Sequence, residues 1–143
     1  MTPSLTDEPR TIQAVLDRSA LHSFARGHIH VGELLIDVAD DDAFMGIPTV
    51  ALLEAYAETR GNQHATALLR LLVTLPGIAV IDLDAETAEA VAHEVEAAEG
   101  DLARSHAVWA AKEHEAWYLT TEPTEVTELL PPGQVHVIPR KDA

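Results

Sequence analysis

Length, composition and charge limit what this chain can be. Its 143 residues are 47% hydrophobic, and 24 acidic against 9 basic residues give a formal net charge of −15. This length fits one domain with a real core, and no apolar run approaches the roughly 20 residues of a membrane span. The chain contains no cysteine, which excludes disulfides and thiolate metal sites. The charge argues against nucleic-acid binding through a basic surface alone, although a bound divalent ion reverses the local potential.

The N-terminal segment MTPSLTDEPR is polar and acidic, unlike the basic-then-apolar layout of a signal peptide. We therefore expect a cytoplasmic protein with no membrane segment, a flexible N-terminus over residues 1–10, and a single domain over residues 11–143.

The first half of this domain alternates between apolar runs and helical patterns. TIQAVLD is a short apolar run that ends in an acid, as expected of a buried parallel strand. The predicted elements are a strand over 11–17, helices over 18–26 and 31–40, a brief strand over 44–47, and a helix from Pro48 to about Thr59 that carries Glu54.

The second half continues the alternation. IAVIDL is the clearest strand in the chain, and the segment after it has alanine and valine at helical spacing with glutamates opposite. The predicted elements are a helix over 63–74, a strand over 78–83, a helix capped by Asp84 and closed by Gly100, a helix over 101–114, a strand over 116–121, a short helix over 122–130, and a strand over 135–139.

Strands separated by helices predict right-handed crossovers and a mostly parallel α/β sheet with helices on both faces. The working site of such a sheet lies beyond the carboxyl ends of its strands. Asp17 ends the first predicted strand, and Glu122 follows AWYLTT. Two acidic residues are therefore expected at the same sheet edge.

Two further acids, Glu54 and Asp101, lie in or at the start of predicted helices. A pocket of carboxylates that repel one another is costly unless a cation holds it together, and Mg²⁺ prefers such hard oxygen ligands. Each residue also has a structural interpretation. Asp17 and Asp101 can cap helices, Glu54 can be a surface residue, and Glu122 can favour a helix N-terminus through its dipole.

Four segments together resemble the PIN-domain family, and most closely the VapC-type toxins of bacterial toxin–antitoxin pairs. They are VLDRSAL (15–21), IPTVALLEAYAE (47–58), GDLARSHAVWAAKEH (100–114) and YLTTEP (118–123). The resemblance covers about residues 12–139. It implies a three-layer α/β/α fold with a mostly parallel central sheet of four to five strands.

The resemblance also implies roles for individual residues. The family's acidic metal ligands match Asp17, Glu54, Asp101 and Glu122, and its supporting hydroxyl residues match Ser19 and Thr120. Glu122 departs from the family pattern, because aspartate is usual at this position in a Thr-x-Asp motif. Glutamate is one methylene longer and would reach the site only with a shifted backbone or through water, so Glu125 is an alternative.

The activity implied by the resemblance is Mg²⁺- or Mn²⁺-dependent hydrolysis of RNA phosphodiester bonds, as the toxin of a type II toxin–antitoxin pair. It further implies a cognate antitoxin and a homodimer. The alternative is a catalytically weakened or inactive PIN-like module that binds a protein partner. Glu122 and the small number of basic residues favour that alternative.

Other candidate residues have structural explanations. His106 is expected to be a packed or surface histidine rather than a catalytic base. Trp109, Trp117 and Tyr118 are expected in the core rather than on a base-stacking surface, because two of them lie in the strand AWYLTT.

Overall fold

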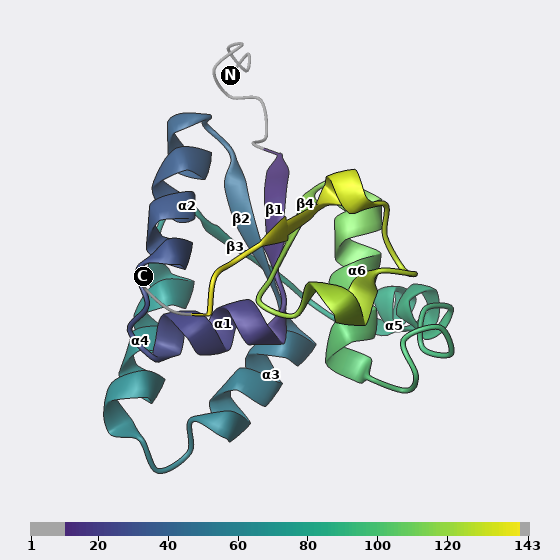
Figure 1. Cartoon of the computed structure of the whole chain (residues 1–143). Helices are drawn as coiled ribbons and strands as arrows, with labels where there is room; N and C mark the ends of the chain where they lie inside the picture. The colour runs from purple at the N-terminus through teal and green to yellow at the C-terminus, as the bar shows by residue number, and fades with distance from the viewer. Residues whose placement is uncertain (1–10, 141–143) are drawn as a thin grey trace, which may run out of the picture.

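The computed structural model describes residues 11–140 and shows an α/β fold (Figure 1). The flexible N-terminus expected at residues 1–10 lies outside the described residues. The strands are β1 (Ile12–Leu16), β2 (Phe44–Pro48), β3 (Ile78–Ile81), β4 (Trp117–Thr120) and β5 (Val135–Val137). The helices are α1 (Arg18–Ala25), α2 (His30–Asp40), α3 (Thr49–Glu58), α4 (Gln63–Thr74), α5 (Ala85–Ala92) and α6 (Leu102–His114), with the short 3₁₀ helices η2 (Pro123–Val126) and η3 (Pro132–Gln134).

All five strands form one parallel sheet in the order β3-β2-β1-β4-β5. Helices α1 to α4 cover one face, and α5 and α6 lie on the other (Figure 1). The predicted α/β class and the three-layer α/β/α arrangement are therefore confirmed.

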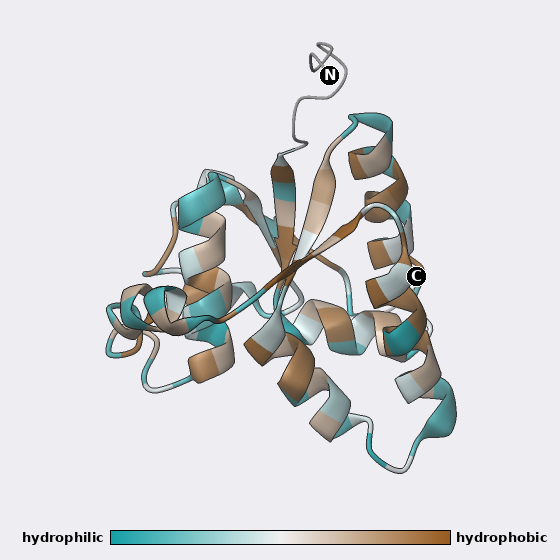
Figure 2. Ribbon diagram, turned by 180° about the vertical axis from the view of Figure 1, so that it is seen from behind, coloured by the Kyte–Doolittle hydropathy of each residue, from teal (hydrophilic) through white to brown (hydrophobic). Residues whose placement is uncertain are grey.

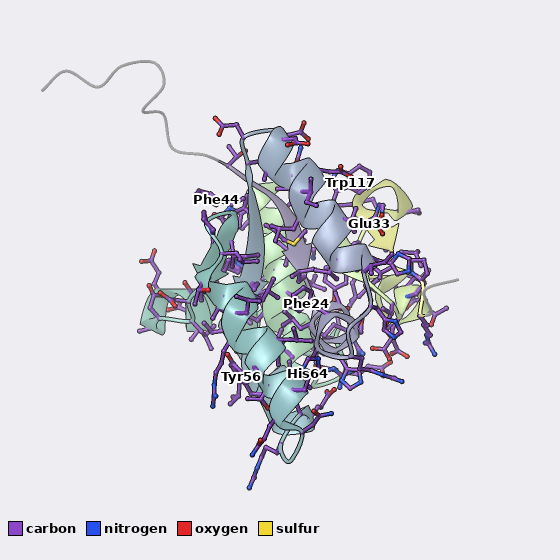
Figure 3. All side chains as sticks on the ribbon, turned by 90° about the vertical axis from the view of Figure 1, so that its left-hand side faces the viewer. Phe24, Glu33, Phe44, Tyr56, His64 and Trp117 are labelled. Atoms are coloured by element: carbon purple, nitrogen blue, oxygen red, sulfur yellow. The ribbon has the colours of Figure 1, made fainter. Side chains whose placement is uncertain are left out.

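Alternation along β1 explains the two layers of core. Ala14 and Leu16 pack with α1 to α4, whereas Val15, between them, packs with α6 and Tyr118. Successive strand residues point to opposite faces, so a continuous apolar run supplies both cores. Phe24 and Tyr56 add partly buried aromatic rings to the α1–α4 side (Figure 3). Hydrophobic colour accordingly concentrates along the central strands, and hydrophilic colour on the outer helix faces and turns (Figure 2).

The helix predicted from Asp84 to Gly100 is wrong in its second half. Asp84 caps α5, but α5 ends at Ala92 and is followed by turns. The backbone there tightens to i→i−3 hydrogen bonds, for example from Val95 N–H to the Ala92 carbonyl. Glu99 and Gly100 then have φ values of 56° and 81°. Helical side-chain spacing therefore did not guarantee a continuous helix.

Four smaller predictions also need correction. Strand β3 stops at Ile81 and β5 at Val137, each two residues short of the predicted end, and the helix predicted over 122–130 is reduced to η2. Trp117 is 47% exposed, whereas Tyr118 is buried as expected. Trp117 lies on β4 next to the short edge strand β5, and its ring contacts His136 edge-on.

The chain reverses its direction of progression across the sheet between β1 and β4. From β1 the strands continue to β2 and β3 on one side, and β4 and β5 lie on the other. Asp17 N–H donates to the Leu119 carbonyl at 3.2 Å, which extends the β1–β4 pairing into the following loop. Ligand sites in parallel sheets form at such a switch point. No helix within residues 11–140 is long and apolar enough to cross a membrane.

Candidate functional site

Asp17 sits directly after β1 and caps α1. Its Oδ1 accepts hydrogen bonds from Ala20 N–H at 2.9 Å and from the Ser19 hydroxyl at 2.6 Å. The side chain is buried, with the residue only 8% exposed. The structural interpretation of Asp17 as a helix cap is therefore confirmed, and this cap fixes where its carboxylate lies.

A chain of hydroxyl groups joins Asp17 to the end of β4. The Ser19 and Thr120 oxygens lie 3.2 Å apart, and Ser19 Oγ also accepts from Thr121 N–H at 2.9 Å. Thr120 Oγ1 accepts from Glu122 N–H at 2.9 Å. The two predicted supporting residues thus hold the loops after β1 and β4 together.

Burial raises the pKa of Asp17 above its ordinary value of 3.8. Hydrogen bonds from Ser19, Thr120, Ala20 and Tyr118 oppose this shift without cancelling it. No lysine, arginine or histidine among residues 11–140 makes an ion pair with Asp17. An ionised carboxylate without a countercharge is costly in such a position. Asp17 is therefore a buried acid that a cation would stabilise.

Tyr118 lies beside this carboxylate. Burial, followed by the negative charge of Asp17, raises the pKa of Tyr118 well above its usual 10.0. The phenol consequently stays protonated and donates a hydrogen bond to Asp17.

Asp101 enters the site as the cap of α6. Its Oδ1 accepts from Arg104 N–H at 2.9 Å, and its Oδ2 lies 3.4 Å from the Arg104 guanidinium. The same guanidinium lies 3.3 Å from Glu125 Oε2. Arg104 therefore joins Asp101 to the residue that the sequence offers as an alternative fourth acid.

Arg18 links acidic residues in the same way that Arg104 links Asp101 to Glu125. Its guanidinium lies 3.3 Å from Glu122, 3.4 Å from Glu58 and 3.9 Å from Glu54. Partial burial lowers the pKa of Arg18, but Glu58 and its neighbouring carboxylates produce a net rise. Arg18 remains a cation, and it forms ion pairs with Glu54 and Glu122, which the sequence predicts as metal ligands.

These groups line one small pocket at the carboxyl edge of the sheet. Its volume is about 10 Å³, roughly the space for one water molecule or ion. The lining residues are Asp17, Arg18, Ser19, Asp101, Ala103, Arg104, Tyr118, Glu122 and Glu125. Four carboxylates and two guanidinium groups leave two negative charges in excess when all are ionised. One divalent cation would balance them.

The structure brings three of the four predicted ligands, Asp17, Asp101 and Glu122, into the lining of this pocket. Glu54 is not in the lining, and its side chain is 38% exposed and reaches the site only through Arg18. Within residues 11–140 no three acidic or histidine side chains are already arranged as ligands of one ion. Metal binding would require rotation of glutamate side chains away from arginine.

Sequence patterns did not predict Arg18, Arg104 or Tyr118 as residues of the site. A usable signal was present, because Arg18 directly follows Asp17 and Arg104 comes three residues after Asp101. In a chain with only nine lysine and arginine residues, an arginine beside each of two candidate acids is informative.

His106 lies on α6 and is completely buried. Its Nδ1 accepts from Val50 N–H at 3.4 Å, and its ring stacks with Trp109. Burial lowers the pKa of His106, and the backbone of Asp82 only partly offsets this effect. His106 is therefore a neutral packed histidine, as expected from the sequence.

In comparisons with known proteins, neither a family model nor a curated protein matches this chain.

Proposed function

We propose that this protein is a metal-dependent endoribonuclease of the PIN class, with Mg²⁺ or Mn²⁺ held by Asp17, Asp101 and Glu122, and with Glu54 as a further ligand once Arg18 releases it. The main support is the buried Asp17 carboxylate. It has no ion pair within the described chain and faces Asp101 and Glu122 across a pocket with excess negative charge. A divalent cation would remove the cost of burying that charge.

The donor set suits such an ion. Carboxylate oxygens are the hard ligands that Mg²⁺ and Mn²⁺ accept, and Mg²⁺ keeps several waters, so a few carboxylates are enough. When bound, the metal would lower the pKa of a water molecule and stabilise charge on a phosphodiester oxygen.

The protein's own groups would hold this arrangement in place. Ser19 and Ala20 fix one oxygen of Asp17, and Tyr118 donates a further hydrogen bond to its carboxylate. Arg104 holds Asp101 at the start of α6. Both acids are therefore oriented before any ligand arrives, which reduces the entropy lost on binding.

RNA cleavage tests this function directly. Purified protein with Mn²⁺ should cleave a structured RNA, and Asp17→Asn and Asp101→Asn should each reduce the rate at least about 100-fold, as expected for loss of a group that holds a catalytic metal. Glu89→Gln removes an exposed carboxylate on α5 away from the pocket and serves as the matched control. Equal trace activity in the wild type and both aspartate variants would refute the proposal.

The toxin role adds a protein partner and a homodimer. A basic antitoxin segment would complement the net charge of −15 and the excess carboxylates of the pocket. If a small reading frame adjoins the gene, co-expression with its product should yield a complex in which RNA cleavage is inhibited. A neighbouring product that neither binds nor inhibits would argue against the toxin role while leaving the nuclease intact.

A second candidate is a PIN-like interaction module without efficient chemistry. Its support is the pairing of Arg18 with Glu122 and Glu54, which gives these glutamates an internal cation. This candidate predicts partner binding with no metal-dependent cleavage, so the RNA assay above separates the two functions.

A further inference from the structure

A larger cleft opens beside the carboxylate pocket. It has a volume of about 420 Å³, within the usual range for small-molecule sites. Arg18, Ser19 and Glu122 line both hollows, so the two are contiguous. The remaining walls come from α1 and the loop after it, from the end of α3, and from the loop after β4. The segment after β5, which runs back past α1, completes the cleft (Figure 1).

Basic residues are concentrated in this cleft. Residues 11–140 contain only seven lysines and arginines, and three of them, Arg18, Arg26 and Arg140, line it. Such a concentration is not expected from composition in a chain with a net charge of −15. His22 and His28 lie in the same walls and extend the surface that can donate hydrogen bonds.

The two acidic residues of the cleft are already paired. Glu58 lies 3.4 Å from Arg18 and 3.0 Å from His22 Nδ1, and Glu122 lies 3.3 Å from Arg18. Arg26 and Arg140, in contrast, form no ion pair with any carboxylate of the described chain. Arg140 Nε donates to the Thr121 carbonyl at 3.2 Å, which holds its side chain beside the β4 loop. Arg26 and Arg140 are therefore the two guanidinium groups of the cleft without a carboxylate partner, and its three arginines and two glutamates leave one positive charge in excess.

Ser23 supplies an independent observation. It is only 5% exposed and lines the cleft, yet its hydroxyl finds no hydrogen-bond partner among residues 11–140. Buried polar groups are normally paired, so an orphan hydroxyl in a cleft wall indicates a missing ligand atom. An anionic ligand in the cleft would give Arg26 and Arg140 a countercharge and would bring a hydrogen-bond acceptor to the wall that contains Ser23.

We propose that this cleft binds a phosphate-bearing nucleotide of the RNA strand, next to the phosphodiester that enters the carboxylate pocket. The inference rests on the proposed function for the identity of the strand. It adds a specific anchoring site at Arg26, Arg140 and Ser23, and it explains how so acidic a protein holds RNA. Contacts of this kind fix the position of a strand without reading its sequence.

The test measures binding separately from cleavage. A fluorescent single-stranded RNA octamer is titrated in EDTA against the wild type, Arg26→Gln/Arg140→Gln, Ser23→Ala and Arg60→Gln/Arg70→Gln. The last variant is the matched control, because it removes two exposed arginines that do not line the cleft. The cleft variant should bind about tenfold more weakly, with the slope of log K against log salt reduced by about 1.4, since each phosphate contact on a single strand contributes about 0.7. Ser23→Ala should weaken binding about threefold, as expected for one lost hydrogen bond to a charged group.

Other ligands identify the source of the phosphate. A mononucleotide whose binding depends equally on Arg26 and Arg140 would support the nucleotide site. It would also show that the cleft recognises one nucleotide of the strand. The inference would be overturned if the two double variants lost equal RNA affinity, or if the cleft variant lost none. Tighter binding of an acidic peptide than of RNA would also overturn it.

The experiments distinguish failure of the proposed RNA-binding cleft from failure of the proposed nuclease activity. Mn²⁺-dependent cleavage that Arg26→Gln/Arg140→Gln leaves unchanged would refute the cleft and retain the nuclease. RNA binding that depends on both arginines, without cleavage in Mn²⁺, would retain the cleft and refute the nuclease.

Discussion

Ser19 and Thr120 are 101 positions apart in the sequence, and their hydroxyl oxygens lie 3.2 Å apart in the folded chain. The contact joins the loop after β1 to the end of β4, where the sheet changes its direction of progression. Ser19 also donates to Asp17 at 2.6 Å. One hydroxyl therefore both joins the loop after β1 to the end of β4 and positions the buried Asp17 carboxylate.

Ser19→Ala should therefore destabilise the protein. It leaves Asp17 with one donor fewer and the Thr121 N–H without its acceptor, at a cost of about 1–3 kcal/mol. That corresponds to a fall in Tm of roughly 3–9 °C for a chain of this size. Ser23→Ala is the matched control on the same helix, since its buried hydroxyl has no partner in the described chain. Equal Tm values for the two variants would contradict this role of Ser19.

Asp17→Asn should stabilise the metal-free protein at neutral pH. Asparagine is as good a helix cap as aspartate, and it removes a carboxylate whose pKa is raised by burial. A raised carboxylate pKa means that the folded state binds the proton more tightly, so ionisation lowers stability as the pH rises above about 3.8. In EDTA the Tm advantage of Asp17→Asn should therefore grow from pH 4 to pH 7. A variant less stable than the wild type at pH 7 would contradict the assignment of an uncompensated charge.

His106 should contribute the opposite pH dependence. Its pKa is lowered by burial, so the unfolded chain takes up the proton first. Stability contributed by neutral His106 is present above pH 6.5 and is lost as the pH falls toward the folded-state pKa. His106→Gln should flatten the change in Tm between pH 7 and pH 5, whatever its effect at pH 7. An unchanged slope would show that another group controls stability in this range.

Arg18→Gln should strengthen divalent-ion binding. Arg18 lies within 4 Å of Glu54, Glu58 and Glu122 and competes with a metal for two of the proposed ligands. Removing one nearby positive charge from a partly exposed site should tighten Mn²⁺ binding about three- to tenfold. Arg60→Gln, an exposed arginine outside both hollows, is the charge-matched control. Weaker or unchanged Mn²⁺ binding by Arg18→Gln, measured by calorimetry, would contradict the competition.

The sequence predicted what depends on local chemistry. Apolar runs located the strands, and their alternation with helices predicted the parallel sheet and hence the position of Asp17 and Glu122 at one edge. Asp101 was correctly predicted to cap its helix. Long-range packing decided the rest. Residue spacing does not encode the separation of Glu54 from the pocket or the early end of α5. The ion pairs of Arg18 and Arg104 depend on side-chain rotamers that are selected only in the folded protein.

Thermal unfolding in EDTA and in excess Mn²⁺ is the most direct test of the metal site. A ligand at 100 times its Kd stabilises the folded state by about 2.7 kcal/mol, or roughly 5–10 °C in Tm at this size. The wild type and Glu89→Gln should show this rise, whereas Asp17→Asn and Asp101→Asn should lose most of it. An equal Mn²⁺-dependent rise in Asp17→Asn and the wild type, or no rise in either, would contradict a cation site built around Asp17.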